Sequence, residues 1–250
     1  RISGCITATP CLQSVRGENE TAEASVTASI DQIRVQRAAG ALGGSVSGVS
    51  LADVASSDAH YRRVRELLVE YEVLFFRDQE QTPSVFAAFA KTFGKVLGHP
   101  AYSTVSEAPD VQILESTPEN RSKIEVWHSD MTFMQCPPSF TLLQGQIIPE
   151  VGGDTLWASA TAAYDALSPQ LRAFLTPLTA VNDFRHGFRE SLAEPGGVER
   201  LAPAIAENPP VDHPLIRTHP ETGRKGIYAN ALFTTHIVGL PSKESDALLA

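Results

Sequence analysis

The sequence has little of what marks a secreted, membrane-bound or disulfide-stabilised protein. Its 250 residues include only three cysteines, Cys5, Cys11 and Cys136, which are too few and too irregularly spaced for a disulfide framework or a zinc module. No apolar run reaches bilayer-spanning length, and the amino-terminal segment lacks the basic-then-apolar order of a signal peptide. We therefore expect free thiols in a cytoplasmic protein with no membrane partner.

The charge balance disfavours polyanionic partners. The chain carries 20 Lys and Arg against 29 Asp and Glu, a formal net charge of −9, and no cluster of basic residues offsets it locally. We therefore expect no nucleic-acid partner. A small anionic substrate would need a cationic pocket of its own. The oligomeric state stays open, a homo-oligomer included.

Length and hydrophobic content indicate one domain that follows a leader of different composition. With 42% hydrophobic residues, the chain can bury one sizeable core. Residues 1–30 are rich in Ser, Thr, Ala and Glu without a sustained period, which predicts a disordered or loosely attached leader. We assign the domain to residues 31–250.

Short predicted strands and helices alternate unevenly along this domain. Caps and apolar stripes predict helices over 58–71 and 82–93, the second beginning with Thr82 and Pro83. The uneven order does not fit a βαβ parallel sheet and favours a double-sheet jelly roll flanked by helices. The strands are expected within 33–49 and at 73–76, 111–114, 140–148, 154–158, 180–183, 214–218 and 226–229, and the other helices at 160–167 and 168–175.

A His-x-Asp pair within Val126–Phe133 suits a metal ion. In an extended backbone, side chains two residues apart project to the same side, so His128 and Asp130 can offer an imidazole nitrogen and a carboxylate oxygen to one point. A second His would complete the 2-His-1-carboxylate triad of non-haem Fe(II) oxygenases. The alternative interpretation is a capped turn in which Asp130 orients His128. The apolar surface of Trp127 and Phe133 favours the metal site because it would limit water there.

Several ordered motifs carry a resemblance to a known family. They are Trp127–Phe133, Cys136–Pro138, Gly152–Trp157, Ala162–Ser168 and His213–Lys225. Together they closely resemble the taurine dioxygenase (TauD/TfdA) family of Fe(II)- and 2-oxoglutarate-dependent dioxygenases, from about residue 33 to Ala250. The resemblance implies a mainly β fold with flanking helices around a double-stranded β-helix, a cupin-like jelly roll. It also implies Fe(II), 2-oxoglutarate and O₂ as cofactor and cosubstrates.

The resemblance assigns roles at the metal and the cosubstrate. His128 and Asp130 would be iron ligands and catalytic residues, and the Thr155 hydroxyl would bond a carboxylate of 2-oxoglutarate. From the sequence alone, Thr155 is an ordinary residue that begins a strand after a Gly-Gly turn. The remaining histidines receive no metal role, and His213 is expected at a strand end.

The resemblance also assigns four substrate contacts. His99 and Tyr102 would face the sulfonate of the substrate, and Phe188 and Phe233 would line its pocket, with plain core packing as the alternative for both aromatic residues. The taurine enzyme has an Asn a few residues before the metal His, where this chain has Ile124–Val126. A less polar sulfonate or an alkyl sulfate is therefore favoured over taurine.

The implied activity is hydroxylation of the carbon next to a sulfonate or sulfate. The product would release sulfite or sulfate, with succinate and CO₂ as co-products, in sulfur metabolism. The alternative within the family is a phenoxyalkanoate-type dioxygenase.

The carboxy-terminal end raises a non-enzymatic alternative. Ser242 begins a helix that stops at Ala250 without the Gly, basic last turn or Pro that commonly ends helices, so we expect a jelly roll that is incomplete at its C-terminus. Family members carry the distal iron-binding His and the 2-oxoglutarate-binding Arg on later strands. The resemblance thus implies that both lie after Ala250, and an inactive truncated copy is the third hypothesis. With two ligands, we expect weak Fe(II) binding.

Overall fold

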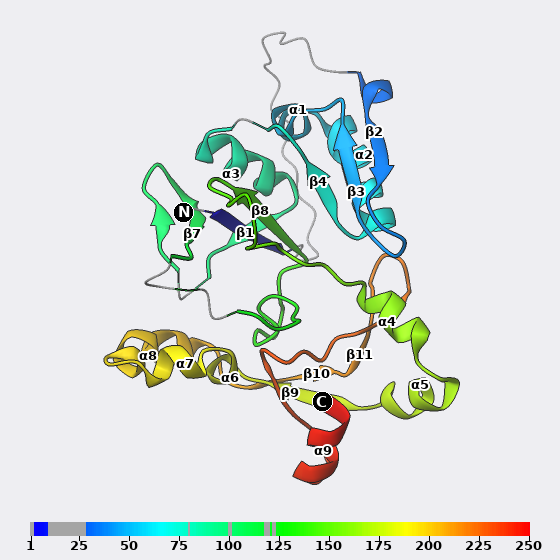
Figure 1. Cartoon of the computed structure of the whole chain (residues 1–250), viewed down its shortest axis with the longest axis vertical. Helices are drawn as coiled ribbons and strands as arrows, with labels where there is room; N and C mark the ends of the chain where they lie inside the picture. Colours follow the sequence, from blue (N-terminus) through cyan, green and yellow to red (C-terminus); the bar gives the residue numbers. More distant parts are fainter. Residues whose placement is uncertain (1–2, 10–28, 80, 100–101, 118–120, 122–123) are drawn as a thin grey trace. The chain divides into compact units, whose positions relative to one another are not determined.

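The computed structural model describes residues 3–9, 29–79, 81–99, 102–117, 121 and 124–250 (Figure 1). They fall into two compact units, which we describe one at a time. The amino-terminal unit consists of Ser3–Leu114 and Ser139–Trp157, and the carboxy-terminal unit of Glu115–Pro138 and Ala158–Ala250. Among the described helices, none is long and apolar enough to cross a bilayer.

The larger sheet of the amino-terminal unit is built around its first strand. Strand β1 (Ser3–Thr9) pairs antiparallel with β5 (Lys95–Leu97), β7 (Ala108–Leu114) and β8 (Phe140–Gly145), and β6 (Thr104–Val105) pairs with β7. This strand differs from the expected disordered or loosely attached leader, because its backbone groups pair with segments distant in sequence, which composition does not reveal. The rest of the expected leader up to residue 28 lies outside the described residues.

A second, three-stranded sheet completes the strands of this unit. Strand β2 (Arg34–Arg37) pairs antiparallel with β3 (Gly44–Ser47), and β3 pairs parallel with β4 (Leu74–Phe76). The 3₁₀ turn η1 (Ile30–Gln32) precedes β2. The expected strands within 33–49 and at 73–76 are thus confirmed.

Local capping signals begin the three helices found among the described residues of the amino-terminal unit. Helix α1 (Leu51–Ser56) opens with a capping box, in which the Ser50 side chain accepts from the backbone of Asp53 and the Asp53 carboxylate accepts from the backbone of Ser50. Helices α2 (Asp58–Tyr71) and α3 (Pro83–Thr92) start at side-chain caps and agree with the predicted helices.

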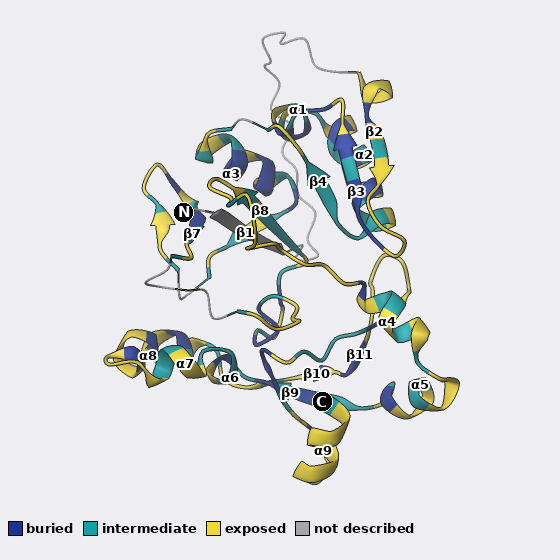
Figure 2. Cartoon of the chain, in the orientation of Figure 1, coloured by how far each residue is buried: buried dark blue, intermediate teal, exposed yellow. Residues whose placement is uncertain are grey.

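The core of this unit packs between α3, α2 and the sheets. Phe86 and Phe89 of α3 are buried, as the predicted apolar face requires. The ring of Phe89 makes edge contacts with Phe76 and Phe93, and Phe93 also packs on Phe140 of β8. Figure 2 shows the buried face of α3 in dark blue.

The carboxy-terminal unit contains two small antiparallel sheets. Strand β9 (Thr179–Asn182) lies between β10 (Val211–Pro214) and β13 (Thr234–Ile237), and β11 (Ile216–Thr218) pairs with β12 (Lys225–Ile227). Buried residues such as Ile216 and Ile237 form its apolar core. Among the described strands of both units, four separate sheets form and no closed barrel.

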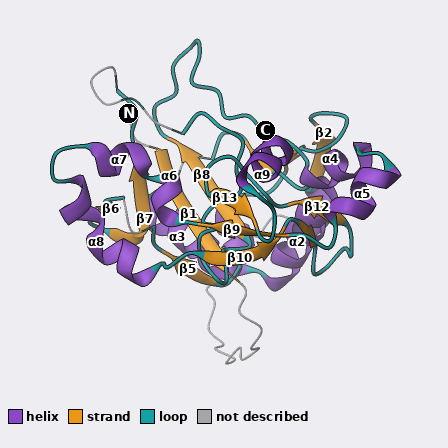
Figure 3. Ribbon diagram, turned by 90° about the horizontal axis from the view of Figure 1, so that it is seen from below, coloured by secondary structure: helices purple, strands orange, loops and turns teal. Residues whose placement is uncertain are grey.

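Six helices accompany these sheets in the described part of this unit. Three of them occupy 184–207, where no helix was expected, and Figure 3 shows this segment as helix. Pro203 argued locally against a helix, but the burial of Leu201 and Ala204, three residues apart, stabilises one. The six are α4 (Ala160–Ala166), α5 (Pro169–Leu175), α6 (Phe184–Gly187), α7 (Arg189–Ala193), α8 (Gly197–Glu207) and α9 (Ser242–Leu249).

The segment after the Gly-Gly turn differs from expectation. Gly152 and Gly153 have positive φ values of 77° and 72°, as a tight turn requires. The predicted strand 154–158 is absent, however, because no described strand pairs with this segment. A β-favouring sequence without a partner strand cannot satisfy its backbone groups in a sheet.

Candidate metal centre

The predicted metal-binding stretch lies in the carboxy-terminal unit and forms a turn. Residues 127–129 have no regular secondary structure, and Asp130–Phe133 form the turn, which the Met134 N–H closes by donating to the Met131 carbonyl at 3.0 Å. Met131 adopts a left-handed backbone with φ of 53°, which is uncommon outside Gly. The pair His128 and Asp130 therefore stands on irregular backbone rather than on a strand.

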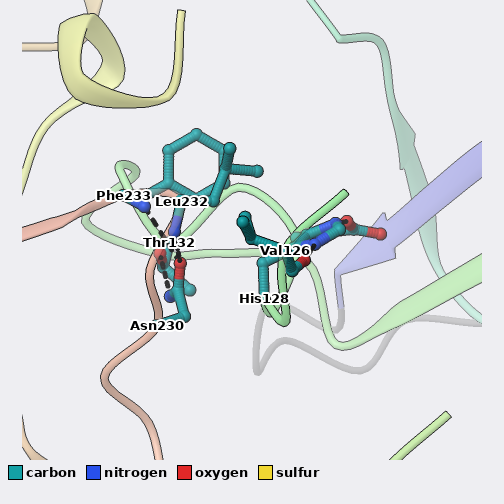
Figure 4. Close-up of polar contacts among 7 residues, drawn as sticks. Val126, His128, Thr132, Asn230, Leu232 and Phe233 are labelled. Atoms are coloured by element: carbon teal, nitrogen blue, oxygen red, sulfur yellow. Dashed lines mark hydrogen bonds and ion pairs between the residues drawn. The ribbon is translucent and has the colours of Figure 1, made fainter. Parts of the chain in front are cut away.

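The two predicted ligands lie side by side. The Nε2 atom of His128 is 3.1 Å from Oδ1 of Asp130, and the side chains are 25% and 37% exposed. On the other edge of the ring, Nδ1 lies 2.8 Å from the Val126 carbonyl, which can only accept, so Nδ1 donates (Figure 4). In the neutral ring, Nε2 then presents its lone pair to a carboxylate oxygen.

This arrangement favours a positive charge at Nε2. The hydrogen bond with Asp130 is the main cause that raises the pKa of His128; burial opposes it, while the Val126 carbonyl and the charge of Asp130 add to it. A proton satisfies both facing acceptors in the absence of a metal. A divalent cation would satisfy them equally, with the orientation of the imidazole set by the Val126 carbonyl.

The pair fits two sites of one metal ion. Two ligands at about 2.1 Å from a metal and about 90° apart are separated by about 3.0 Å, close to the observed 3.1 Å. Among the described residues, no group of three His, Cys, Asp or Glu side chains is close enough to hold a metal. The described chain therefore supplies an imidazole and a carboxylate, which suit Fe(II).

A polar cluster of the buried Thr132 and Asn182 with the partly buried Asn230 follows this pair and was not expected from the sequence. Thr132 is 0% exposed, and its hydroxyl donates to Oδ1 of Asn182 at 3.1 Å and accepts from Nδ2 of Asn230 at 3.0 Å. The partners lie 50 and 98 residues away in sequence. The one available signal was an Asn in a predicted apolar strand.

The two predicted aromatic pocket residues belong to one cluster around Phe133. The buried Phe233 ring lies 5.0 Å from Phe133, and Phe133 lies 5.1 Å from Phe184, which stacks on the half-buried Phe188 at 4.4 Å. Gly187 allows this packing because a Cβ there would come within 2.4 Å of Phe233. Phe233 thus has the surroundings of a core residue, and Phe188 forms the more accessible edge of the cluster.

The other three predicted site residues belong to the amino-terminal unit, described by itself. The rings of His99 and Tyr102 are 4.6 Å apart, so the two predicted substrate contacts lie together. The buried Gln112 holds this loop, because its side chain accepts from the His99 N–H and donates to the His99 carbonyl. Residues 100 and 101 of the same motif lie outside the described residues. Thr155 is exposed in the segment without regular structure.

His213 makes a hydrogen bond within the fold. It lies buried in β10, where its Nε2 donates to the Met134 carbonyl at 2.9 Å. Its ring also makes an edge contact with Tyr228. This position agrees with the expected strand-end role and connects β10 to the turn that follows Asp130.

A His-x-Asp pair on a turn, in a unit of small antiparallel sheets with flanking helices, indicates a protein with a candidate imidazole–carboxylate metal site. The chain belongs to the taurine catabolism dioxygenase TauD, TfdA family, whose model matches residues 34–250. This confirms the resemblance that the motifs indicated.

Curated relatives are about a third identical to this chain over the aligned regions. An alkylsulfatase of Acinetobacter baylyi is 33% identical over 87% of this chain and 68% of its own length. An alpha-ketoglutarate-dependent sulfonate dioxygenase of Saccharomyces cerevisiae is 30% identical over 88% and 54%. An (S)-phenoxypropionate/alpha-ketoglutarate-dioxygenase of Sphingobium herbicidovorans is 33% identical over 83% and 73%. The chain thus spans only about half of the yeast relative.

Solved structures confirm the expected fold class. A taurine dioxygenase from Burkholderia xenovorans matches with a TM-score of 0.70 and 33% identity, over 87% of this chain and 70% of that one. AAD-2 in complex with Mn(II) and N-oxalylglycine matches with a TM-score of 0.67 and 28% identity, over 87% and 76%. The fold is therefore that of the TauD-like dioxygenases, a jelly roll with flanking helices.

Proposed function

We propose that the protein is an Fe(II)- and 2-oxoglutarate-dependent dioxygenase that hydroxylates the carbon next to a sulfonate or sulfate ester. The observation that carries the proposal is the His128–Asp130 pair, with Nε2 and Oδ1 3.1 Å apart in a member of the TauD/TfdA family. The relatives named for alkylsulfatase and sulfonate dioxygenase activities support the substrate class. The chain spans 68% and 54% of the length of these two relatives, so the activity of the whole protein is part of the proposal.

His128 and Asp130 would hold the iron. Bound Fe(II) with 2-oxoglutarate and O₂ supplies an oxidant that hydroxylates an unactivated C–H bond and leaves succinate and CO₂. The Val126 carbonyl keeps the Nε2 lone pair of His128 directed at the metal position, and Asp130 contributes a negative charge that offsets part of the metal's charge. Hydroxylation makes the neighbouring C–S or C–O bond labile, and an aldehyde leaves with sulfite or sulfate.

Three further residues have proposed ligand contacts. Thr155 would donate its hydroxyl to a carboxylate of 2-oxoglutarate, and His99 and Tyr102 would face the anionic head of the substrate. The 4.6 Å separation of the His99 and Tyr102 rings supports a shared role. Phe188 is the better candidate for a pocket wall than Phe233, because it is less buried.

The substrate is proposed to be less polar than taurine. The segment Ile124–Val126 precedes His128 where the taurine enzyme has an Asn that helps to line the pocket, so two apolar side chains and Glu125 stand in that segment. A medium-chain alkyl sulfate or alkanesulfonate fits this change. It is an anionic small molecule with an apolar tail.

The test measures succinate, sulfate and sulfite with Fe(II), 2-oxoglutarate and a panel of substrates. Taurine, alkanesulfonates, alkyl sulfates and phenoxypropionate are supplied to the natural gene product and to the 250-residue chain in parallel. Turnover with an alkyl sulfate or alkanesulfonate, lost in Asp130→Ala, is the expected result. If no sulfur compound stimulates succinate formation in either protein, the proposed substrate class is wrong.

A phenoxyalkanoate dioxygenase is the second candidate. The observation that favours it is the phenoxypropionate dioxygenase relative, as identical to this chain as the alkylsulfatase and matched over more of its length. Hydroxylation of the carbon that bears the ether oxygen would release a phenol. Phenol release without sulfate or sulfite release in the same panel would select this activity.

A further inference from the structure

The turn that carries Asp130 is held in an unfavourable backbone conformation. Met131 has a φ of 53° and is 2% exposed. A non-Gly residue in this region persists only where its surroundings hold it. The contacts of the next residues, from Thr132 to Met134, therefore decide whether the turn keeps its shape.

Thr132 connects the turn directly to β9, the middle strand of the sheet β10-β9-β13, and through Asn182 to the edge strand β13. Its hydroxyl donates to Asn182 Oδ1 of β9, which also accepts from the hydroxyl of Thr234 in β13 at 3.1 Å. Asn182 is 1% exposed and donates its own amide to the Ala180 carbonyl at 3.3 Å. The hydroxyl of Thr132 thus has a defined donor direction in a buried site.

Asn230 fixes the same hydroxyl from the other side. Its Nδ2 donates to Thr132 Oγ1 at 3.0 Å, while its Oδ1 accepts from the backbone N–H groups of Leu232 at 3.2 Å and Phe233 at 3.0 Å (Figure 4). Its own N–H donates to Thr234 Oγ1 at 3.0 Å. A buried network in which each member has a partner restricts the positions of all its members.

A second contact holds the far end of the turn. The Met134 carbonyl accepts from Nε2 of the buried His213 in β10. The turn is therefore attached to β9 and the β13 loop through Thr132 and to β10 through Met134. Asp130 precedes these two anchors, and it lies two residues from His128.

We propose that Thr132 is a positioning residue: its hydroxyl, held by Asn182 and Asn230, keeps the Met131 turn in the conformation that places Asp130 beside Nε2 of His128 for a divalent metal. The inference rests on the proposed function only in naming the metal as the ligand of the pair. The anchoring of the turn is a property of the metal-free protein and is measured separately.

The first experiment measures the anchoring without metal. Hydrogen exchange of the Met134 amide, which donates to Met131, reports local opening of the turn. We expect Thr132→Val to accelerate the exchange of the Met134 amide by about 10-fold or more, beyond any acceleration that its change in global stability causes. Thr132→Ser keeps the hydroxyl and is expected to exchange at the wild-type rate. Thr235→Val is the matched control, because Thr235 donates to the Val181 carbonyl of the same sheet and not to the network.

The second experiment measures Mn(II) affinity of the 250-residue chain by electron paramagnetic resonance of the free ion. Loss of a supporting contact behind a ligand typically weakens metal binding by about 10–100-fold, so Thr132→Val is expected to fall in this range. Thr132→Ser and Thr235→Val are expected to keep the wild-type affinity. Should Thr132→Val not fold, Asn230→Asp removes the donor to Thr132 and leaves the acceptor for Leu232 and Phe233.

The outcomes separate this inference from the proposed function. If Thr132→Val or Asn230→Asp changes neither the Met134 exchange nor the Mn(II) affinity beyond Thr235→Val, the positioning role is wrong. If Asp130→Ala leaves Mn(II) binding unaltered, the metal role of the pair fails. If Asp130→Ala leaves Mn(II) binding unaltered but Thr132→Val accelerates Met134 exchange, the anchoring of the turn is supported although the metal role fails.

Discussion

Replacement of Phe133 by Ala tests whether the aromatic cluster around Phe133 is a structural core. Phe133 is 1% exposed, and its ring makes edge contacts with Phe184 at 5.1 Å and Phe233 at 5.0 Å. Truncation of a buried Phe costs about 3–5 kcal/mol of unfolding free energy. Single domains have roughly 5–15 kcal/mol in total, so this is a large share.

A second substitution of Phe133 separates the cost of losing the ring contacts from the cost of losing apolar volume. Phe133→Leu keeps most of the apolar volume and loses the two ring–ring contacts, each about 0.5–1.5 kcal/mol, so we expect about 1–3 kcal/mol. Phe174→Ala is the matched control: Phe174 is 48% exposed, and its truncation should cost at most about 1 kcal/mol. The order of destabilisation should be Phe133→Ala, then Phe133→Leu, then Phe174→Ala.

Urea unfolding followed by circular dichroism measures these differences, and the thermal midpoint provides a second measure. A loss of 3–5 kcal/mol corresponds to a fall of about 6–20 °C in a protein of this size. A Phe133→Ala variant no less stable than Phe174→Ala would refute the assignment of Phe133 to a packed core. The support that this cluster gives to the turn after Asp130 would then be absent.

Two further predictions concern the pair and the packing behind it. In the metal-free protein, Asp130→Asn should lower the pKa of His128, measured by NMR titration, because Asp130 is the largest cause of its raised value. A folded-state pKa above the unfolded value of about 6.5 adds stability that is fully present below the unfolded pKa and is lost as the pH rises through the folded pKa. Asp130→Asn should therefore lose stability mainly at pH values below the unfolded pKa. An unchanged pKa of His128 would contradict its hydrogen bond with Asp130. Gly187→Ala should destabilise by about 1–3 kcal/mol in urea, because its Cβ would come within 2.4 Å of Phe233, and an unaffected midpoint would show that the cluster can shift.

The sequence carried the signals that act over short distances. Helices α2 and α3 begin where Ser57 and Thr82 cap them, since a cap and the helix it starts are neighbours along the chain. His128 and Asp130 are two residues apart, so their convergence on one point was a local inference as well. The ordered motifs were enough to identify the TauD/TfdA family.

Features that depend on a distant partner were decided by the tertiary structure. Strand β1 forms because it pairs with β5, β7 and β8, while the predicted strand 154–158 does not form because no described strand pairs with it. Helix α8 contains Pro203 and is stabilised by the burial of its apolar face. In each case a long-range contact outweighed the local preference.

The same distinction applies to the His128–Asp130 pair. The sequence placed an imidazole and a carboxylate close together, and the proposed chemistry follows from these residue types. It did not reveal that Thr132 meets Asn182 and Asn230, because these residues lie 50 and 98 positions away and are brought together only when the sheet and its loop close around the turn. Residue type and local spacing determined which ligand is proposed for the site, and tertiary hydrogen bonds determined the surroundings of the turn that carries Asp130.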